Sequence, residues 1–150
     1  MSSKDCKAMD HFMRAQSGAH GPTYDRALAE LRAGLKTSHW IWYVLPQLRA
    51  LGRSVMAREF GIADLAEAQA YAAHPVPGPR LVACVQAVLA HEQRGAVAVL
   101  GAVDAMKFRS CLTLFEQAAP DEPVFALALQ RLYGGVRDEA TLDLLGVQRK

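Results

Sequence analysis

The chain has 150 residues, of which 51% are hydrophobic and 21% are charged, and its formal net charge is +2. A chain of this length can bury a core without disulfide or metal support, and this composition excludes an intrinsically disordered protein. Because so small a charge gives no electrostatic reason to bind DNA, RNA or an anionic membrane, we expect neither a nucleic-acid nor a membrane partner.

The cysteines and the apolar runs indicate where the protein resides. Cys6, Cys84 and Cys111 are an odd number without CxxC spacing, so the sequence predicts neither a disulfide framework nor a zinc site. The polar start lacks the apolar segment of a signal peptide, and the longest apolar run, residues 96–103, is too short to span a bilayer. We expect a soluble protein of the reducing cytoplasm.

Signals for helices follow one another along the chain, and nothing reads as paired strands. Apolar periodicity and glycine stops predict about seven to eight short helices, with briefer turns between them. Nine segments carry signals of helical structure, at 5–16, 23–34, 46–52, 54–60, 64–73, 81–91, 104–119, 123–133 and 138–145. We expect a short helical turn at 38–44, a rigid turn at 74–79, and a further turn or short helix at 95–100. The predicted fold is a single compact all-α domain over 1–150, with its core between about 9 and 146.

Five side chains are placed to cap helices at their N-termini, since each precedes a run of helical period. They are Thr23, Ser54, Asp64, Asp104 and Asp138. Pro46 is expected to open the helix that ends at Gly52, because the first turn of a helix does not need its N–H.

The common catalytic and nucleotide-binding motifs are missing from the sequence. There is no GxGxxG after a strand, no GxxxxGKS, no HExxH and no GxSxG. The sequence therefore predicts no metal and no cofactor, and it leaves open whether the chain is an enzyme. Two stretches dense in polar and aromatic residues remain as candidates for a site.

The first stretch runs from residue 36 to residue 54 and holds both tryptophans of the chain, Trp40 and Trp42. A tryptophan buries a large area and still needs a partner for its indole N–H, so these two either anchor a core or wall a pocket. Polar side chains interleaved with them favour the pocket, namely Ser38, His39, Tyr43 and Gln47.

The second stretch runs from residue 104 to residue 115. On a helix Lys107, Ser110 and Cys111 share one side, while Arg109 and Thr113 pair on another. Such groups could donate hydrogen bonds to an anionic ligand. The structural alternative is that Asp104 caps the helix, the two cations face solvent, and Ser110 bonds back to the backbone.

Together these stretches resemble a known family. The pattern consists of KxSHWxWYxxPQLxxLGxS at 36–54, EAxxY at 67–71 with HP at 74–75 and GxRL at 78–81, and DxxK at 104–107 with Ser110 and TLF at 113–115. It is similar to the bacterial domain of unknown function 1810, and the similarity extends over roughly residues 9–146. The resemblance implies an all-helical, cytoplasmic, single-domain protein, and it supplies no activity and no catalytic residues.

The residues suggest roles for a site that combines both stretches. His39 is the candidate acid or base and Lys107 the candidate catalytic cation. The candidate ligand-binding residues are Lys36, Ser38, Trp40, Trp42, Gln47, Arg80, Ser110 and Thr113. Each has a structural alternative: His39 can be bonded within the core, and Arg80 can be an ordinary surface residue.

Two classes of function follow from these residues. One is an enzyme or binder for a small anionic ligand, nucleotide-derived or similar, with a ring stacked on a tryptophan. The other is a helical adaptor that presents a tryptophan patch to a protein partner. We favour the pocket, because an interface has no need of Ser, His, Gln and Lys at one place, and we predict that residues 36–47 pack against residues 104–113.

Overall fold

The computed structural model describes residues 3–147, with side chains from residue 9 onward. In this range the chain forms ten α-helices and, apart from one isolated bridge, no β-structure. They are α1 (Ser3–Arg14), α2 (Tyr24–Ala33), α3 (Ile41–Val44), α4 (Val55–Glu59), α5 (Leu65–Ala73), α6 (Pro77–Leu89), α7 (Ala96–Leu100), α8 (Ala102–Ala118), α9 (Pro123–Tyr133) and α10 (Glu139–Leu145). A π-helical turn, η1 (Ala15–Ala19), extends α1, and a 3-10 turn, η2 (Arg49–Leu51), follows α3. The all-α prediction is confirmed, with somewhat more helices than expected.

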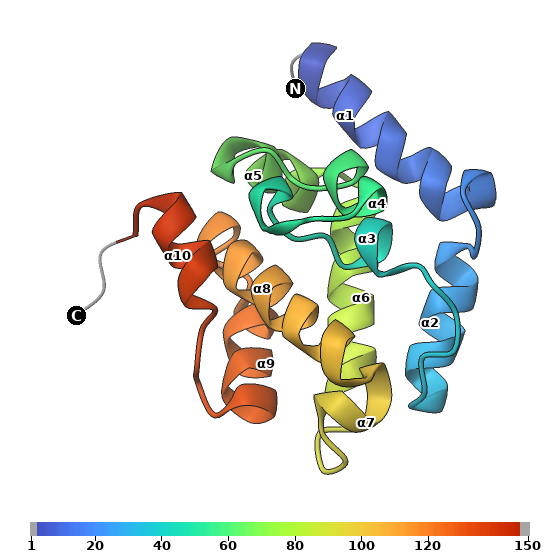
Figure 1. Ribbon diagram of the computed structural model, residues 1–150, viewed down its shortest axis with the longest axis vertical. Coiled ribbons are helices and arrows are strands. Elements are labelled where there is room, and N and C mark those ends of the chain that lie inside the picture. The colour runs from blue at the N-terminus through green and yellow to red at the C-terminus, as the bar shows by residue number, and fades with distance from the viewer. Residues whose placement is uncertain (1–2, 148–150) are drawn as a thin grey trace.

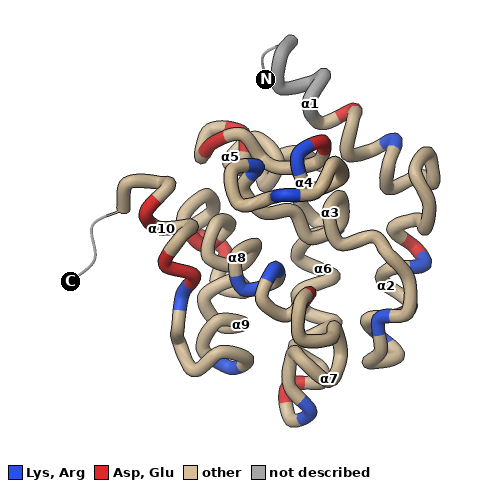
Figure 2. The backbone as a smooth tube through the Cα atoms, viewed as in Figure 1, with Lys and Arg blue, Asp and Glu red and all other residues tan. Residues whose placement is uncertain are grey.

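Helices α6 and α8 organise the packing. Helix α8 contacts α5, α7, α9 and α10, while α6 packs against α2, α5 and α9. Figure 1 shows α6 upright in the middle of the molecule, with α2 on one side and α8 and α9 on the other. Basic and acidic residues occur together on α1, α2, α4 and α8 (Figure 2). Of the helices described, none is both long and apolar enough to cross a membrane.

A row of buried aromatic rings connects four helices. Phe12 of α1 lies 5.0 Å from Tyr71 of α5, Tyr71 lies 5.4 Å from Phe115 of α8, and Phe115 lies 5.8 Å from Phe125 of α9, all between ring centroids. Aromatic pairs at such distances contribute about 0.5–1.5 kcal/mol beyond their buried area. The row ties the first helix to the second half of the chain.

The predicted N-caps are confirmed at four of five positions. Their side-chain oxygens accept backbone N–H groups three residues ahead at 2.8–3.1 Å, at Thr23, Ser54, Asp64 and Asp138. The prediction for Asp104 is wrong, because α8 begins at Ala102 behind Gly101, which has no side chain to cap it. Asp104 lies in the first turn instead, and its carboxylate pairs with Lys36.

The helix predicted over 46–52 is also wrong. Leu48 is extended and forms an isolated parallel bridge with Ile62, and helical structure is limited to η2. The Arg49 N–H donates to the carbonyl of Ile62 at 2.8 Å, and the Ile62 N–H donates to the carbonyl of Gln47 at 2.9 Å. Burial of Leu48 and Ile62 at this crossing outweighs the local preference for helix.

The boundaries of α6 differ from the prediction at both ends. The helix begins at Pro77, inside the turn expected at 74–79, and ends at Leu89. Pro77 is tolerated because the first turn of a helix leaves its N–H groups unpaired within the helix. Pro77 therefore occupies the first position of α6, and the helix begins earlier in the chain than predicted.

Gly61 allows the closest approach between the two crossing segments. A Cβ at this position would lie 2.3 Å from Cα of Arg49 and 2.8 Å from the carbonyl oxygen of Ala57. We expect Gly61→Ala to lower the free energy of unfolding by about 1–3 kcal/mol, the usual cost of inserting an atom where the backbone cannot retreat. Urea denaturation followed by circular dichroism measures the change. A midpoint equal to that of the parent protein would contradict a tightly held crossing.

Candidate functional site

The segment that precedes and forms α3 lies against the start of α8, as the sequence predicted. The Lys36 ammonium is 2.8 Å from the Asp104 carboxylate, and the Lys36 N–H donates to the carbonyl of Val99 at 2.8 Å. The Lys107 ammonium lies 5.5 Å from the centroid of the Trp42 ring. Residues that are some seventy positions apart in sequence therefore meet at one place.

A groove of about 350 Å³ separates these two segments. From the first segment it is lined by Lys36, His39, Ile41 and Trp42, and from the end of α7 and the start of α8 by Leu100, Gly101, Ala102, Val103, Asp104 and Lys107. His39 is exposed, and the Lys107 side chain is 31% exposed. The groove thus carries an imidazole, an ammonium and part of an indole ring, all open to a small molecule.

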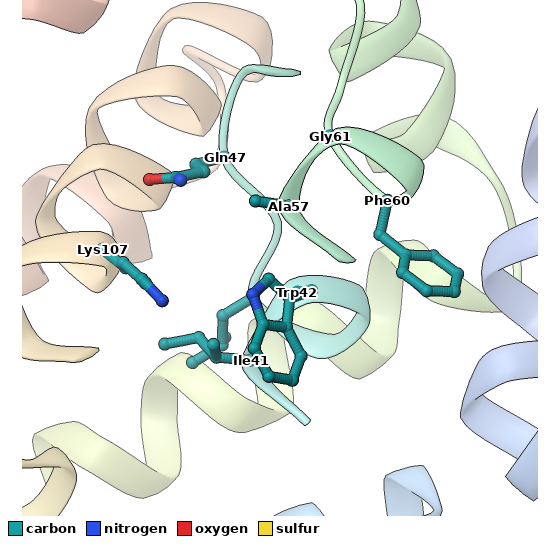
Figure 3. Close-up of a pocket in the computed structure, with 8 residues that line it drawn as sticks. Ile41, Trp42, Gln47, Ala57, Phe60, Gly61 and Lys107 are labelled. Carbon is teal, nitrogen blue, oxygen red and sulfur yellow. The ribbon is translucent and has the colours of Figure 1, made fainter. Parts of the chain in front are cut away.

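A small cavity lies beside the groove, around Trp42 (Figure 3). Its volume is about 10 Å³, and its walls are Ile41, Trp42, Leu45, Gln47, Ala57, Phe60, Gly61 and Lys107. Trp42 and Lys107 therefore line both the cavity and the groove. A space of this size accommodates about one water-sized group.

The two tryptophans are held differently. Trp40 is completely buried, and its indole N–H donates to the Glu30 carboxylate at 2.9 Å. Trp42 is half-buried, and its indole nitrogen, although shielded from solvent, has no hydrogen-bond partner among the described residues. Trp40 is part of the core, whereas Trp42 belongs to the groove.

The Glu30 carboxylate of α2 holds the segment in place. It accepts the backbone N–H groups of Thr37 and Ser38 at 2.9 and 3.0 Å, the Ser38 hydroxyl at 2.5 Å and the Trp40 indole N–H. Burial alone would raise the pKa of the Glu30 carboxyl, but these hydrogen bonds outweigh it and hold the pKa well below its usual range. Glu30 is thus charged at neutral pH and fixes residues 37–40.

The two lysines of the groove have different surroundings. The Lys36 side chain is 5% exposed, and its ammonium is bound by Asp104, by the carbonyl of Ser38 at 2.7 Å and by the Trp40 ring at 4.9 Å. Lys107 lies 3.8 Å from the other Asp104 oxygen, a distance too long for a good hydrogen bond. Lys36 is committed to the fold, while the Lys107 ammonium remains available to a ligand.

Gln47, Ser110 and Thr113 are candidate residues that do not line the groove itself. Gln47 lines the small cavity, and with Ser110 and Lys107 it also lines a neighbouring hollow of about 270 Å³. The hydroxyls of Ser110 and Thr113 donate to carbonyls of their own helix at 3.3 and 2.8 Å. For Ser110 the structure thus shows the structural alternative, a hydroxyl that bonds back to its own helix, and its role as a ligand-binding residue stays a prediction.

Arg80 lies in a different network from the groove. Its guanidinium donates to the Gln16 side chain at 3.0 Å and lies 4.8 Å from the centroid of the Tyr24 ring. Gln16 is buried and donates in turn to the carbonyl of Tyr43 and to the hydroxyl of Tyr71. Arg80 therefore takes part in a hydrogen-bond network that connects η1 to the core, and it does not line the groove.

Buried cysteines offer no nucleophile in the part of the chain whose side chains are described. Burial raises the pKa of the Cys84 thiol to about 12 and the pKa of the Cys111 thiol well above its ordinary value. Both are neutral thiols at physiological pH, as expected of small apolar core residues. Residues 9–147 contain no group of three His, Cys, Asp or Glu side chains that could hold a metal ion.

Sequence reasoning missed Glu30 and Gln16, the two polar residues that fix the segments around the site. Both lie on helices where a glutamate or glutamine usually faces solvent. The partners of Glu30 in the next segment are 7–10 residues away and those of Gln16 are 27–64 residues away, so no local pattern reveals them. Only a signal of spatial contact would have identified them.

Comparison with known proteins agrees with this architecture. The model of a family described as "Protein of unknown function (DUF1810)" matches residues 6–145. The chain belongs to the DUF1810 family. The crystal structure of the conserved hypothetical protein Rv1873 from Mycobacterium tuberculosis superposes on this DUF1810 chain with a TM-score of 0.82 and 40% sequence identity. The match covers 91% of this chain and 97% of that one. No curated protein matches the chain.

The first prediction of this site concerns the Glu30 carboxylate. Because hydrogen bonds to a charged group contribute about 1.5–3 kcal/mol each, we expect Glu30→Gln to lower the free energy of unfolding by at least about 2 kcal/mol near pH 7. The lowered pKa stabilises the fold above the unfolded-state pKa, so the difference from the parent should shrink as the pH falls below about 4.3. Urea denaturation at several pH values measures it, with exposed Glu59→Gln as the control.

A second prediction separates the two charges beside Asp104. Asp104→Asn leaves the buried Lys36 ammonium without its counter-charge, and we expect a loss of about 1–3 kcal/mol in unfolding free energy. Lys107→Gln removes a long, partly exposed ion pair and the contact of the ammonium with the Trp42 ring, so its effect should stay within about 1 kcal/mol. Thermal and urea denaturation of both variants test the contrast. Equal losses in the two variants would contradict it.

Proposed function

We propose that the groove between residues 36–42 and the start of α8 binds a small organic anion whose planar ring stacks on Trp42. The observation that carries the proposal is the Lys107 ammonium, held 5.5 Å from the Trp42 ring centroid at the rim of the groove. One face of the site thus offers an aromatic surface and a positive charge together. Stacking on such a surface contributes about 1–3 kcal/mol for a nucleobase, and the cation adds selection for negative charge.

The surroundings support a small ligand and not a polyanion. Figure 2 shows both acidic and basic residues spread over the described helices, and the formal net charge of the chain is only +2. The first turn of α8 lines the groove together with the end of α7. Nucleotides and other ring-bearing anions fit this combination of groups.

His39 and Lys107 line the same groove, so an imidazole and an ammonium can both reach a bound ligand. An acid–base role for His39 and a charge-neutralising role for Lys107 remain predictions. Lys36, Ser38 and Trp40 hold the first segment of the groove in position, because their polar atoms bind Asp104 or Glu30.

The alternative function is a helical adaptor for a protein partner. Val103 and Met106 of α8 are 66% and 64% exposed; both line the neighbouring hollow, and Val103 also lines the groove. Against this alternative, Trp40 is buried and cannot anchor a partner, and Trp42 lines a concave surface. We therefore favour the small ligand.

A thermal-shift screen of nucleotides, nucleosides, dinucleotide cofactors, sugar phosphates and aromatic carboxylates tests the proposal. A ligand at a hundred times its dissociation constant stabilises the fold by about 2.7 kcal/mol. For a domain of this size each kcal/mol raises the melting temperature by roughly 2–4 °C, so a shift of several degrees is expected. The shift should disappear in Lys107→Gln and decrease in His39→Ala.

The matched control is Arg32→Gln, which removes one positive charge from the exposed end of α2, outside the groove. This variant should respond to ligands as the parent does. If no compound stabilises the parent, or if Lys107→Gln responds fully, the proposed pocket gives way to the adaptor.

A further inference from the structure

The indole N–H of Trp42 is a donor without an acceptor. Its nitrogen exposes less than 1 Å² of surface and has no hydrogen-bond partner within the described chain. An indole N–H can only donate, and buried tryptophans usually find an acceptor for it. The Trp40 N–H shows the ordinary outcome, because it donates to Glu30 at 2.9 Å. The Trp42 N–H therefore indicates a place for an acceptor that the protein does not itself supply.

The small cavity beside Trp42 is the place where that acceptor would lie. Figure 3 shows the indole nitrogen on the side of the ring that faces Lys107, with the Gln47 side chain nearby. The cavity volume of about 10 Å³ accommodates one oxygen-sized group and excludes a ring. A ligand body must therefore remain in the adjoining groove, which shares Trp42 and Lys107 with the cavity.

The charges around the cavity select the kind of acceptor. Lys36 and Asp104 neutralise each other at 2.8 Å, so Lys107 leaves this side of the groove with one net positive charge. A carboxylate matches that charge, whereas a phosphate monoester dianion would bring a second negative charge toward Asp104. A carboxylate also has an oxygen that can accept the indole N–H while the group pairs with an ammonium.

We propose that the cavity takes one oxygen of a ligand carboxylate, which accepts the Trp42 indole N–H and pairs with the Lys107 ammonium. This inference rests on the proposed function and narrows its ligand to ring-bearing carboxylates. The ring lies in the groove, and the carboxylate points toward Gln47. A water molecule bound in the cavity is the competing occupant, and the experiment must separate the two.

Nuclear magnetic resonance of the ¹⁵N-labelled protein reads the two indole groups separately, because the chain has two tryptophans. The probes are acetate, benzoate, inorganic phosphate and phenyl phosphate. We expect benzoate, and more weakly acetate, to shift the Trp42 indole resonance in a saturable way while that of Trp40 stays in place. Phosphate and phenyl phosphate should shift it less at equal concentration.

Two variants test the assignment of the Trp42 resonance and the role of the Lys107 ammonium. Trp42→Phe identifies the resonance and should weaken benzoate binding roughly tenfold or more, the fold-change expected for one lost charge-assisted hydrogen bond. Lys107→Gln should abolish the shift of the Trp42 resonance, and Arg32→Gln should preserve it. If Trp42→Phe fails to fold, nuclear Overhauser contacts in the parent protein assign the resonances, and Lys107→Gln carries the test.

The inference is overturned if neither carboxylate shifts the Trp42 resonance, or if the phosphates shift it equally. A resonance that no probe moves is the result expected of a cavity that holds water, or nothing, in place of a carboxylate. If a compound raises the melting temperature through Lys107 while the Trp42 indole resonance stays in place, the proposed function stands and the carboxylate assignment fails. If no compound raises it, the groove itself is not the ligand site.

Discussion

The Glu30 carboxylate is the interaction on which the candidate site depends. It lies on α2 and accepts four hydrogen bonds from the next segment: from the backbone N–H groups of Thr37 and Ser38, the Ser38 hydroxyl and the Trp40 indole N–H. Without it, the backbone N–H groups of 37 and 38 would need other acceptors and the Trp40 indole N–H would be buried without a partner. One side chain thus converts a connection between two helices into a rigid wall of the groove.

The ion pair between Lys36 and Asp104 holds the same segment against α8. Its ammonium joins Asp104 at the start of α8 to the carbonyl of Ser38, so the segment is held to α2 by Glu30 and to α8 by Lys36. A buried ion pair is a weak contributor to stability relative to apolar packing, but breaking it by removing one partner is costly. The pair therefore fixes the relative position of two elements more than it adds to the total stability.

Local signals in the sequence were sufficient for most helices. The caps at Thr23, Ser54, Asp64 and Asp138 act over three residues, and the sequence displays them directly. The 46–52 segment failed because its conformation depends on pairing with Ile62, more than ten residues away, which local propensity does not include. The cap prediction for Asp104 failed because α8 begins two residues earlier, at Ala102 behind Gly101, and the Asp104 carboxylate pairs with Lys36 instead.

The sequence was enough to predict which stretches form the candidate site, but not how their side chains are arranged. Composition was enough to single out the two stretches, because their density of aromatic and polar residues is visible without coordinates. Which tryptophan faces the groove depends on the position of Glu30, and Arg80 joined the set only through its place at a helix start. Its actual partner, Gln16, is 64 residues away.

The family pattern divides into two parts once the contacts are known. Lys36, Ser38, Trp40 and Asp104 bind to one another or to Glu30, so the fold itself accounts for their presence together. Trp42 and Lys107 are placed by the same segments, but the fold leaves an indole N–H unpaired and an ammonium half-exposed beside it. A polar atom that folding shields from water without bonding it costs stability, and a ligand that supplies the missing acceptor would recover that cost. Under the proposed function, the part of the pattern that binds the ligand is the part whose polar groups the fold leaves unsatisfied.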